Sequence, residues 1–318
     1  MTEGDHSTVM EFILVGIPEK SQLKIPLFLF FQAIYMFTLV GNLSMITLSG
    51  LSSHLHIPMY YLVSSLSFSD LCHSTVITPK MLVNFVMEKN VIFYSKYVTQ
   101  LYFFLVLGIS ECHMLAAMAY DSYVTICKPL LYNVTMSSRV CCWMVAGVYS
   151  MGLVGAATHT LCMLRVLFCK ANVINHFFCD LYPLLELSCS STFINEVVVL
   201  SFSALNILLP TLSIFASYIF IIGSILHIRS TTGRSKAFST CSSHILAVSV
   251  FFGSLVFMHL QPSSVSSMDQ RKVSSLFYTI IVPMLNPLIY SLRNKDVNVA
   301  LKKFFGKKKV LMKKFLLQ

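Results

Sequence analysis

Two acidic residues, Asp70 and Glu111, fall inside long apolar stretches, where little water is available to solvate a carboxylate. By helical rise, Asp70 lies ~18 Å beyond a helix start near Pro58. Glu111 lies ~15 Å before Asp121 at the end of its own stretch, so the two acids share a similar depth. One intramembrane carboxylate costs about 2.5 to 3.5 kcal/mol, so two at one level require a cation, a shared proton or water. The alternative is one protonated carboxyl that hydrogen-bonds to serines such as Ser67.

Enzyme chemistry has little support in the sequence. Glu111, Cys112 and His113 are adjacent and suggest a soft-metal site, but consecutive helical residues point about 100° apart and cannot all face one ion. The motifs GxSxG, HExxH and CxxC are absent from the sequence, and no serine has an evident catalytic partner. We therefore expect a protein that is not an enzyme, without a metal role for His113.

A third cluster of polar groups ends an apolar run in the stretch MAYDSYVTICKPLLY, Met118 to Tyr132. Asp121 and Tyr123 stand where a buried helix would emerge into water. The cation Lys128 and a proline, which cannot continue a helix, follow them. The stretch therefore marks the end of a membrane-spanning helix.

The elements that position these residues follow from composition. The chain is 56% hydrophobic and 11% charged, with a mean hydropathy of +0.74, whereas soluble domains carry about 25% charged residues. Seven windows approach the ~20 apolar residues that cross a bilayer. They are centred near Met36, Leu66, Leu107, Gly152, Leu208, Val250 and Ile281. We expect an all-α membrane protein with one domain over 1–318, an amino-terminal segment 1–24, a long second outer loop 164–195 and a basic tail 293–318.

The lysines and arginines are unevenly distributed between the expected loops. If the spans alternate, most of them share one side with the tail segment KKFFGKKKVLMKK, and the positive-inside rule makes that side cytoplasmic. We expect a multi-pass plasma-membrane protein with its amino terminus outside and its carboxyl terminus inside. The net charge of +10 is concentrated in the tail and favours anionic lipid rather than nucleic acid, at about 1 kcal/mol per cation. A tail without a specific partner is the open alternative.

Motifs along nearly the whole chain resemble those of vertebrate olfactory receptors, a branch of the rhodopsin-like G-protein-coupled receptors. In order, they are EFILVGI, LHIPMYYLVSSLSFSDLCHSTVITPKML, MAYDSYVTICKPLLY, NVINHFFCDLYPLLELSC, GRSKAFSTCSSHIL and PMLNPLIYSLRNKDV. The resemblance implies a rhodopsin-like bundle of seven transmembrane helices with a short amphipathic C-terminal helix. It also implies an odorant as ligand and, as partner, a heterotrimeric G protein of the stimulatory olfactory type, which raises cyclic AMP.

The resemblance further implies which residues carry these functions. The lining of the odorant pocket in the outer half would be Phe104, Leu105, Gly108, Phe202, Ser203, Asn206, Phe252, Leu255, Val256, His259, Leu276 and Thr279. This lining has few polar points and no charge, which fits a small neutral volatile molecule. Plain helix packing is the alternative for such stripes. G-protein coupling and activation would involve Asp121, Ser122, Tyr123, Tyr218, Lys236, His244, Asn286, Pro287 and Tyr290.

The resemblance also places a sodium ion at the acid pair Asp70 and Glu111, with Asn42 and Asn286 as polar neighbours. Hard oxygen ligands suit sodium and do not suit copper or zinc. This ion would be structural, and no other cofactor is expected. The protonated pair described above is the alternative.

Three departures from the family pattern affect function. Ser122 stands where most of the family carries arginine, and Tyr97 replaces a cysteine that would staple the third span to the second outer loop. Cys112 lies ~22 Å further along that helix, too far for a disulfide. We therefore predict a bridge between Cys169 and Cys189 with Cys179 unpaired; three reduced cysteines are the alternative. The amino-terminal glycosylation signal is also absent, because GDHST has Asp5 where an asparagine would make the acceptor.

Two further readings of function stay open beside an active odorant receptor. One is a receptor-like protein whose trafficking or G-protein coupling is impaired by the changes at Ser122 and Tyr97. A more distant one is a membrane transporter, which would require coupled charges or broken helices in matching halves of the chain. The sequence does not show which odorant binds.

Overall fold

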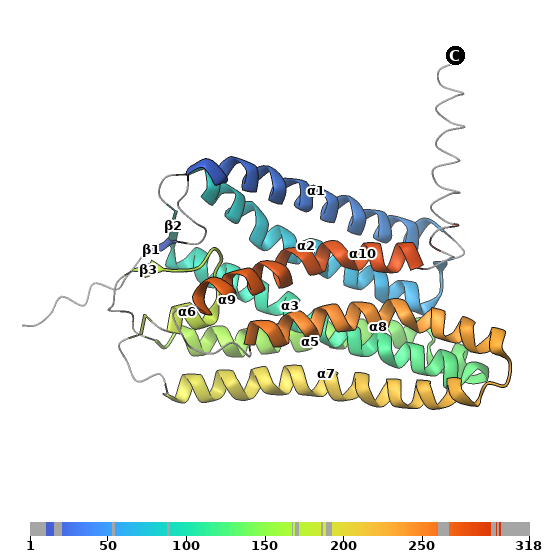
Figure 1. Cartoon of the computed structure of the whole chain (residues 1–318). Helices are drawn as coiled ribbons and strands as arrows, with labels where there is room; N and C mark the ends of the chain where they lie inside the picture. Colours follow the sequence, from blue (N-terminus) through green and yellow to red (C-terminus); the bar gives the residue numbers. More distant parts are fainter. Residues whose placement is uncertain are drawn as a thin grey trace, which may run out of the picture.

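The computed structural model describes residues 11–15, 21–52, 55–87, 90–166, 168, 172–185, 187–188, 193–259, 267–293, 297 and 299. Long helices run roughly side by side along one axis (Figure 1). They are α1 (Ser21–Leu51), α2 (Pro58–Val86), α3 (Tyr94–Cys127), α5 (Ser138–Met163), α7 (Phe193–His227), α8 (Thr231–His259), α9 (Ser267–Leu276), the π-helical turn η3 (Phe277–Ile281) and α10 (Val282–Arg293). The predicted C-terminal amphipathic helix falls almost wholly outside the described residues.

Seven spans make up the bundle, as predicted. Six helical runs of the described chain are long and apolar enough to cross a membrane: α1, α3, α5, α7, α8 and the continuous run from α9 through η3 into α10. The seventh, α2, has 29 residues but is more polar, because it carries Asp70, His73 and Lys80. The all-α, seven-helix fold class is therefore confirmed.

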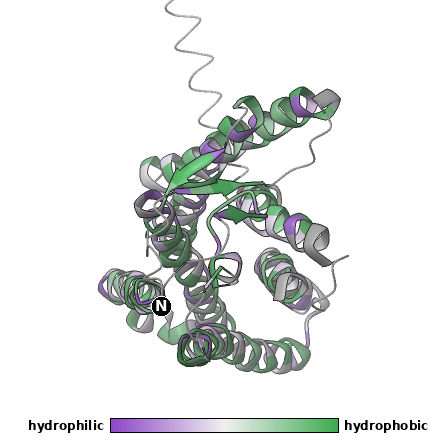
Figure 2. Ribbon diagram, turned by 90° about the vertical axis from the view of Figure 1, so that its left-hand side faces the viewer, coloured by the Kyte–Doolittle hydropathy of each residue, from purple (hydrophilic) through white to green (hydrophobic). Residues whose placement is uncertain are grey.

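The outer faces of the helices are apolar because they meet lipid. Figure 2, a ribbon view along the bundle, shows that hydrophobic residues are frequent throughout the helices. Leu212, Phe215 and Ile219 on α7 are each more than 60% exposed. Within the spans, many hydroxyls bond the carbonyl four residues earlier, as Thr38 does to Ile34 at 2.9 Å, which satisfies these side chains inside their own helix.

α3 lies at the centre of the bundle and contacts α2, α5, α7 and α8. Glycines in α5 bring it close to α3. A β-carbon at Gly152 would lie 2.6 Å from the Val106 carbonyl oxygen, and one at Gly155 would lie 2.8 Å from Ile109 Cδ1. The absence of side chains at these positions therefore sets the α3–α5 packing.

A three-stranded sheet closes one end of the bundle, called here the strand end (Figure 1). β1 (Glu11–Leu14) lies between β2 (Val91–Phe93), to which it is antiparallel, and β3 (Val173–Ile174), to which it is parallel. Phe12 is fully buried. The sequence analysis did not predict this sheet.

The opposite end carries the stretch around Pro129. α3 ends at Cys127, as the proline predicts, and η2 (Pro129–Leu131) and α4 (Tyr132–Thr135) follow. The Ser137 hydroxyl then caps α5 by accepting the Val140 N–H at 3.4 Å.

Candidate ligand-binding cavity

A cavity of about 110 Å³ lies in the strand-end half of the bundle. Its walls come from α3, α5, α7, α8, η3 and the segment that leads into α6 (Leu181–Leu185). The lining residues are Phe104, Leu105, Gly108, Ile109, Cys112, His159, Asp180, Leu181, Ser203, Asn206, Ile207, Leu255 and Tyr278. Most are apolar, and the polar groups are few and separated, which is the usual composition of a small-molecule site.

Half of the predicted pocket residues line this cavity. They are Phe104, Leu105, Gly108, Ser203, Asn206 and Leu255. Phe202, Phe252, Val256, Leu276 and Thr279 are not part of the lining. The side chain of His259 lies outside the described residues. Val256 is 53% exposed and turns outward, and the Thr279 hydroxyl donates to the Ser275 carbonyl at 2.7 Å within its own helix.

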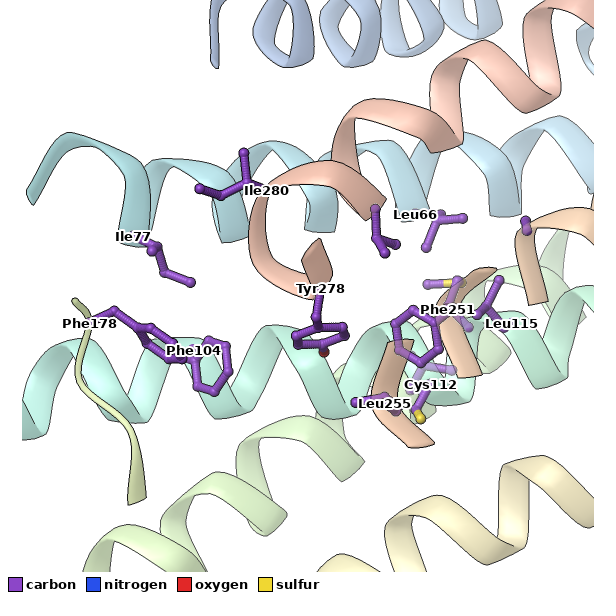
Figure 3. Close-up of a cluster of buried hydrophobic side chains, with 14 of the residues drawn as sticks. Leu66, Ile77, Phe104, Cys112, Leu115, Phe178, Phe251, Leu255, Tyr278 and Ile280 are labelled. Atoms are coloured by element: carbon purple, nitrogen blue, oxygen red, sulfur yellow. The ribbon is translucent and has the colours of Figure 1, made fainter. Parts of the chain in front are cut away.

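Tyr278 lines the cavity although the sequence analysis did not select it. It belongs to η3, a π-helical turn that inserts an extra residue and rotates the following face relative to regular 3.6-residue spacing. A β-carbon at Gly108 would lie 2.9 Å from the Tyr278 hydroxyl, so this glycine makes room for the tyrosine. Figure 3 shows Phe104, Tyr278 and Leu255 gathered along α3.

His159 was also missed by the sequence analysis. It lies on α5, is 2% exposed, and its Nδ1 atom is buried without a hydrogen-bond partner among the described residues. A single histidine in an apolar helix gives no spacing signal, which is why periodicity did not reveal it.

One charged side chain lines the cavity, contrary to the expectation of an uncharged lining. Asp180 reaches the strand end of the cavity from the loop between β3 and α6. Its Oδ1 atom accepts the N–H of Leu181 at 2.7 Å, so the carboxylate caps the start of α6. The sequence analysis could not place this loop residue because no periodic pattern positions it.

The two buried acids lie beside this cavity and have different partners. Asp70 accepts hydrogen bonds from Asn286 Nδ2 on both oxygens, at 3.2 and 3.0 Å. Glu111 Oε1 lies 2.8 Å from His73 Nδ1, and this imidazole was not singled out in the sequence. The expected neighbour Asn286 is therefore in place, and the His73 ring packs against the rings of Phe104 and Tyr278 at 5.3 and 5.5 Å.

The fit of a sodium ion to these acids is mixed. The carboxylate oxygens are suitable hard ligands, and Asn42 Oδ1 is buried without a partner among the described residues. However, nitrogen donors already occupy both Asp70 oxygens and one Glu111 oxygen. A cation would compete with Asn286 and His73 for these atoms.

At the opposite end, Asp121 pairs with a tyrosine. Tyr132 donates its hydroxyl to Asp121 Oδ1 at 3.0 Å, and burial raises the pKa of Tyr132, as does the Asp121 charge. The Ser122 hydroxyl donates to the Met118 carbonyl of its own helix at 3.0 Å. Asp121, the neighbour of Ser122, is thus held by the segment after α3.

The other predicted coupling residues surround this region. Tyr218 hydrogen-bonds His244 between α7 and α8, and Tyr123 packs on Phe220 with ring centroids 5.9 Å apart. The Tyr290 hydroxyl is buried without a partner among the described residues. Pro287 lies inside α10 beside Gly41 of α1. The side chain of Lys236 lies outside the description.

The predicted disulfide cannot be placed, because Cys169 and Cys189 lie outside the described residues. Cys179 is a buried free thiol that donates to Gln100 Oε1 at 2.7 Å, and burial raises the pKa of this thiol well above its usual value. The adjacent Asp180 contacts Tyr97 through its backbone. This tyrosine therefore joins α3 to the loop at the position where the family has a cysteine.

Metal chemistry gains no support from the described part of the chain. No group of three or more His, Cys, Asp or Glu side chains there is arranged to hold a metal ion. His113 Nδ1 lies 2.9 Å from the Ile109 carbonyl oxygen, within its own helix.

Comparisons with known proteins agree with the motifs. A sequence profile described as "Olfactory receptor" matches residues 31–308. The chain is 69% identical to olfactory receptor 8G50 of Mus musculus over 309 residues, which cover 97% of this chain and 99% of that protein. It is 68% identical to olfactory receptor 8G5 of Homo sapiens over 311 residues, covering 98% and 90%. The crystal structure of squid rhodopsin matches with a TM-score of 0.74 at 19% identity, over 92% of this chain and 87% of the rhodopsin chain, which shows the fold.

Proposed function

The chain belongs to the olfactory receptor family, and from that premise we propose that it binds a small, neutral, volatile organic molecule in the strand-end cavity and activates a stimulatory olfactory G protein, which raises cyclic AMP. It is a multi-pass membrane receptor rather than an enzyme. The proposed orientation puts the strand end outside the cell and the Pro129 end in the cytosol, in keeping with the basic carboxyl-terminal segment.

The observation that carries this proposal is the cavity itself. Its walls are mainly apolar, and the polar atoms of His159, Asn206 and Tyr278 are distributed singly among them. Such a lining holds an uncharged ligand by shape and one or two hydrogen bonds. The cavity also adjoins the His73–Glu111 pair through Phe104 and Tyr278, so a ligand can influence the buried polar centre of the bundle.

Signalling requires that the ligand favours one arrangement of the bundle over another. Pro210 in α7 and Pro287 in α10 interrupt backbone hydrogen bonding and provide bend points. Movement there would displace Tyr218 and Tyr290, which lie between the cavity and the proposed G-protein face. We propose the cytosolic ends of α3, α7 and α8 as that face.

A second candidate, a receptor with impaired coupling, is favoured by Ser122. Its short hydroxyl is directed to the Met118 carbonyl, so it supplies no charge to a partner protein. Arginine at this position would carry five donors and a fixed positive charge. The residue present here predicts weaker agonist-driven signalling.

Sodium at Asp70 and Glu111 and anionic lipid at the basic tail complete the proposal. If sodium binds, exchanging sodium chloride for choline chloride will lower the thermal midpoint of the wild-type receptor but not of Asp70→Asn. Lipid binding at the tail predicts that vesicles containing phosphatidylserine retain a tail peptide, 293–318, and that neutral vesicles do not. An unchanged midpoint, or equal retention by both vesicles, would reject the corresponding proposal.

The central experiment is a cyclic AMP reporter assay in cells that express the receptor. A panel of volatiles is applied to wild type, Ser122→Arg and Tyr97→Cys, with surface expression measured by an amino-terminal tag on intact cells. An odorant receptor gives dose-dependent cyclic AMP with at least one compound in at least one of these forms. A receptor that reaches the surface in all forms, yet neither binds nor responds to any compound, contradicts the proposed function.

A further inference from the structure

The side of the cavity formed by α5 and α7 holds two polar side chains that have unused hydrogen-bonding atoms. His159 is 2% exposed and Asn206 is 8% exposed, and both line the cavity. The Nδ1 atom of His159 is buried and has no hydrogen-bond partner among the described residues. Buried polar groups in folded proteins are nearly always satisfied, so an unpartnered imidazole nitrogen on a side chain that lines a cavity points to a ligand.

Asn206 presents an acceptor to this space. Its Nδ2 atom donates to the Phe202 carbonyl at 2.9 Å, which leaves Oδ1 without a partner in the described structure. Gly155 of α5 lies beside this amide: a β-carbon there would lie 3.4 Å from Nδ2 and 3.8 Å from Oδ1. The glycine therefore lets α5 approach Asn206 closely.

Gly155 on α5 adjoins Asn206 on α7, and His159 adjoins Phe202. His159 is one turn beyond Gly155 on α5, and Phe202 is one turn before Asn206 on α7. The rings of His159 and Phe202 are 6.5 Å apart in an edge-to-face arrangement, which fixes the level of the imidazole. The two polar groups are thus separated by about one helical turn, a span that one ligand functional group can bridge.

The donor and acceptor types of these groups define that functional group. The Asn206 oxygen only accepts, so it requires a donor from the ligand. A neutral imidazole supplies one donor and one acceptor, so His159 can bond to an oxygen that also donates elsewhere. A hydroxyl meets both demands, because it donates one hydrogen bond and accepts others. A ketone oxygen can use only His159, and a hydrocarbon can use neither.

The remaining wall limits the size of the molecule. Leu105, Ile109, Ile207 and Leu255 form the apolar part of the lining. A cavity of about 150 Å³ accepts benzene, so the volume of about 110 Å³ here suits roughly five or six non-hydrogen atoms.

We propose that the cavity is selective for small uncharged alcohols, whose hydroxyl donates to Asn206 Oδ1 and bonds a ring nitrogen of His159 while the hydrocarbon part contacts the apolar wall. This inference rests on the proposed odorant-receptor function and specifies the ligand class of the same cavity.

Asp180 defines the rival ligand, an amine. Its carboxylate also lines the cavity, and a cation could pair with it. However, Asp180 caps α6 through Leu181, and the polar pair His159 and Asn206 offers a cation no counter-charge. The geometry therefore favours the alcohol, and the test includes the amine as an outcome.

The experiment uses four probes on one ring: cyclopentanol, cyclopentanone, cyclopentane and cyclopentylamine. Their affinities for purified full-length receptor are measured from the concentration dependence of the thermal midpoint, a readout that does not depend on G-protein coupling. Cyclopentanol is expected to bind roughly threefold to tenfold more tightly than cyclopentanone, the effect of one net hydrogen bond. Asn206→Leu and His159→Phe should each remove this preference and leave cyclopentane affinity within about twofold.

Thr158→Val is the matched control, because Thr158 lies next to His159 on α5 and its hydroxyl bonds the Val154 carbonyl instead of the cavity. It should keep the alcohol preference. Equal affinity for cyclopentanol and cyclopentanone would overturn the inference, as would an alcohol preference that survives in both Asn206→Leu and His159→Phe. It would also be overturned if cyclopentylamine bound most tightly and Asp180→Asn abolished that binding. In each case a volatile still binds, so the odorant-receptor function stands. If none of the four probes binds, the alcohol inference is also overturned. The odorant-receptor function is rejected only if no compound of the whole volatile panel binds or gives a response.

Discussion

The Tyr97 hydroxyl makes two hydrogen bonds with the backbone of Asp180: it donates to the carbonyl oxygen at 2.6 Å and accepts the N–H at 3.1 Å. These bonds join α3 to the loop that forms one wall of the cavity. The Tyr97 ring also lies 5.6 Å from the ring of Phe12 in β1, so one side chain connects the sheet, the loop and the bundle. A noncovalent contact therefore stands here in place of the family's disulfide.

Tyr97→Phe should destabilise the receptor by about 1 to 3 kcal/mol, because it removes two hydrogen bonds to the Asp180 backbone, each worth about 0.5 to 1.5 kcal/mol. Thermal unfolding of purified protein and the rate of maleimide labelling of Cys179 measure the effect, and labelling should become faster. Tyr94→Phe is the control, since the Tyr94 ring packs on Phe12 and Phe168 but its hydroxyl makes no hydrogen bond in the described structure. Equal stability of the two variants would refute the role of this hydroxyl.

Ser122→Arg should increase agonist-driven cyclic AMP at matched surface expression. An arginine would supply a charged donor, worth roughly tenfold in agonist potency if it makes one charge-assisted contact. Ser122→Lys, which adds charge without the planar fork, is the control and should recover less. Unchanged efficacy and potency in Ser122→Arg would show that coupling does not depend on this position.

The His73–Glu111 pair should be needed for stability. His73→Phe removes the partner of a buried carboxylate, with a cost of about 3 to 5 kcal/mol. Glu111→Gln keeps an oxygen that can accept from the imidazole, so its cost should be less than half as large. The thermal midpoints of the two variants in the same detergent test this order. If Glu111→Gln is the more damaging change, an ion rather than His73 compensates the acid.

The spans could be predicted from the sequence because apolar length is a local property. The end of α3 at Cys127 likewise followed from Pro129. The strand-end sheet could not be predicted from the sequence, since each strand has at most four residues and its partners are distant in sequence: Phe12 pairs with Ile92. Pairing of this kind depends on where the helices bring the loops.

The site was partly predictable for a similar reason. Helical spacing on α3 selected Phe104 and Gly108, and both line the cavity. On the last span the family resemblance selected Leu276 and Thr279, but the π-helical turn places Tyr278 in the wall. His159 carries no periodic signal, and its importance appears only when the missing hydrogen bond at its Nδ1 atom is seen.

Acidic pH should destabilise the folded protein at its strand end, because His176 is buried there in its neutral form. Burial lowers the pKa of His176 to about 3 from an ordinary value near 6.5, and the Lys272 charge adds to this. Between about pH 3 and pH 6.5 the unfolded chain binds more protons at this histidine than the folded protein does. The contribution of neutral His176 to the free energy of unfolding is therefore fully present above about pH 6.5 and falls as the pH decreases. At pH 5 the free energy of unfolding is lower by about 2 kcal/mol. Thermal midpoints at pH 7 and pH 5 measure it. His176→Phe should reduce the difference between the two midpoints, and an equal difference in both proteins would exclude this histidine as the cause.

Gly152→Ala should disrupt the packing of α5 on α3. A β-carbon there would clash with the Ser110 hydroxyl and lie 2.6 Å from the Val106 carbonyl oxygen, and the backbone atom cannot move without displacing α3. We expect a loss of about 1 to 3 kcal/mol, the usual cost of overpacking. Gly147→Ala on the same helix is the control, because its β-carbon would meet no atom within 4 Å and alanine favours the helix. Thermal midpoints should therefore fall for Gly152→Ala and stay level or rise for Gly147→Ala. If both variants kept the wild-type midpoint, the contact between α3 and α5 would be looser than the structure shows.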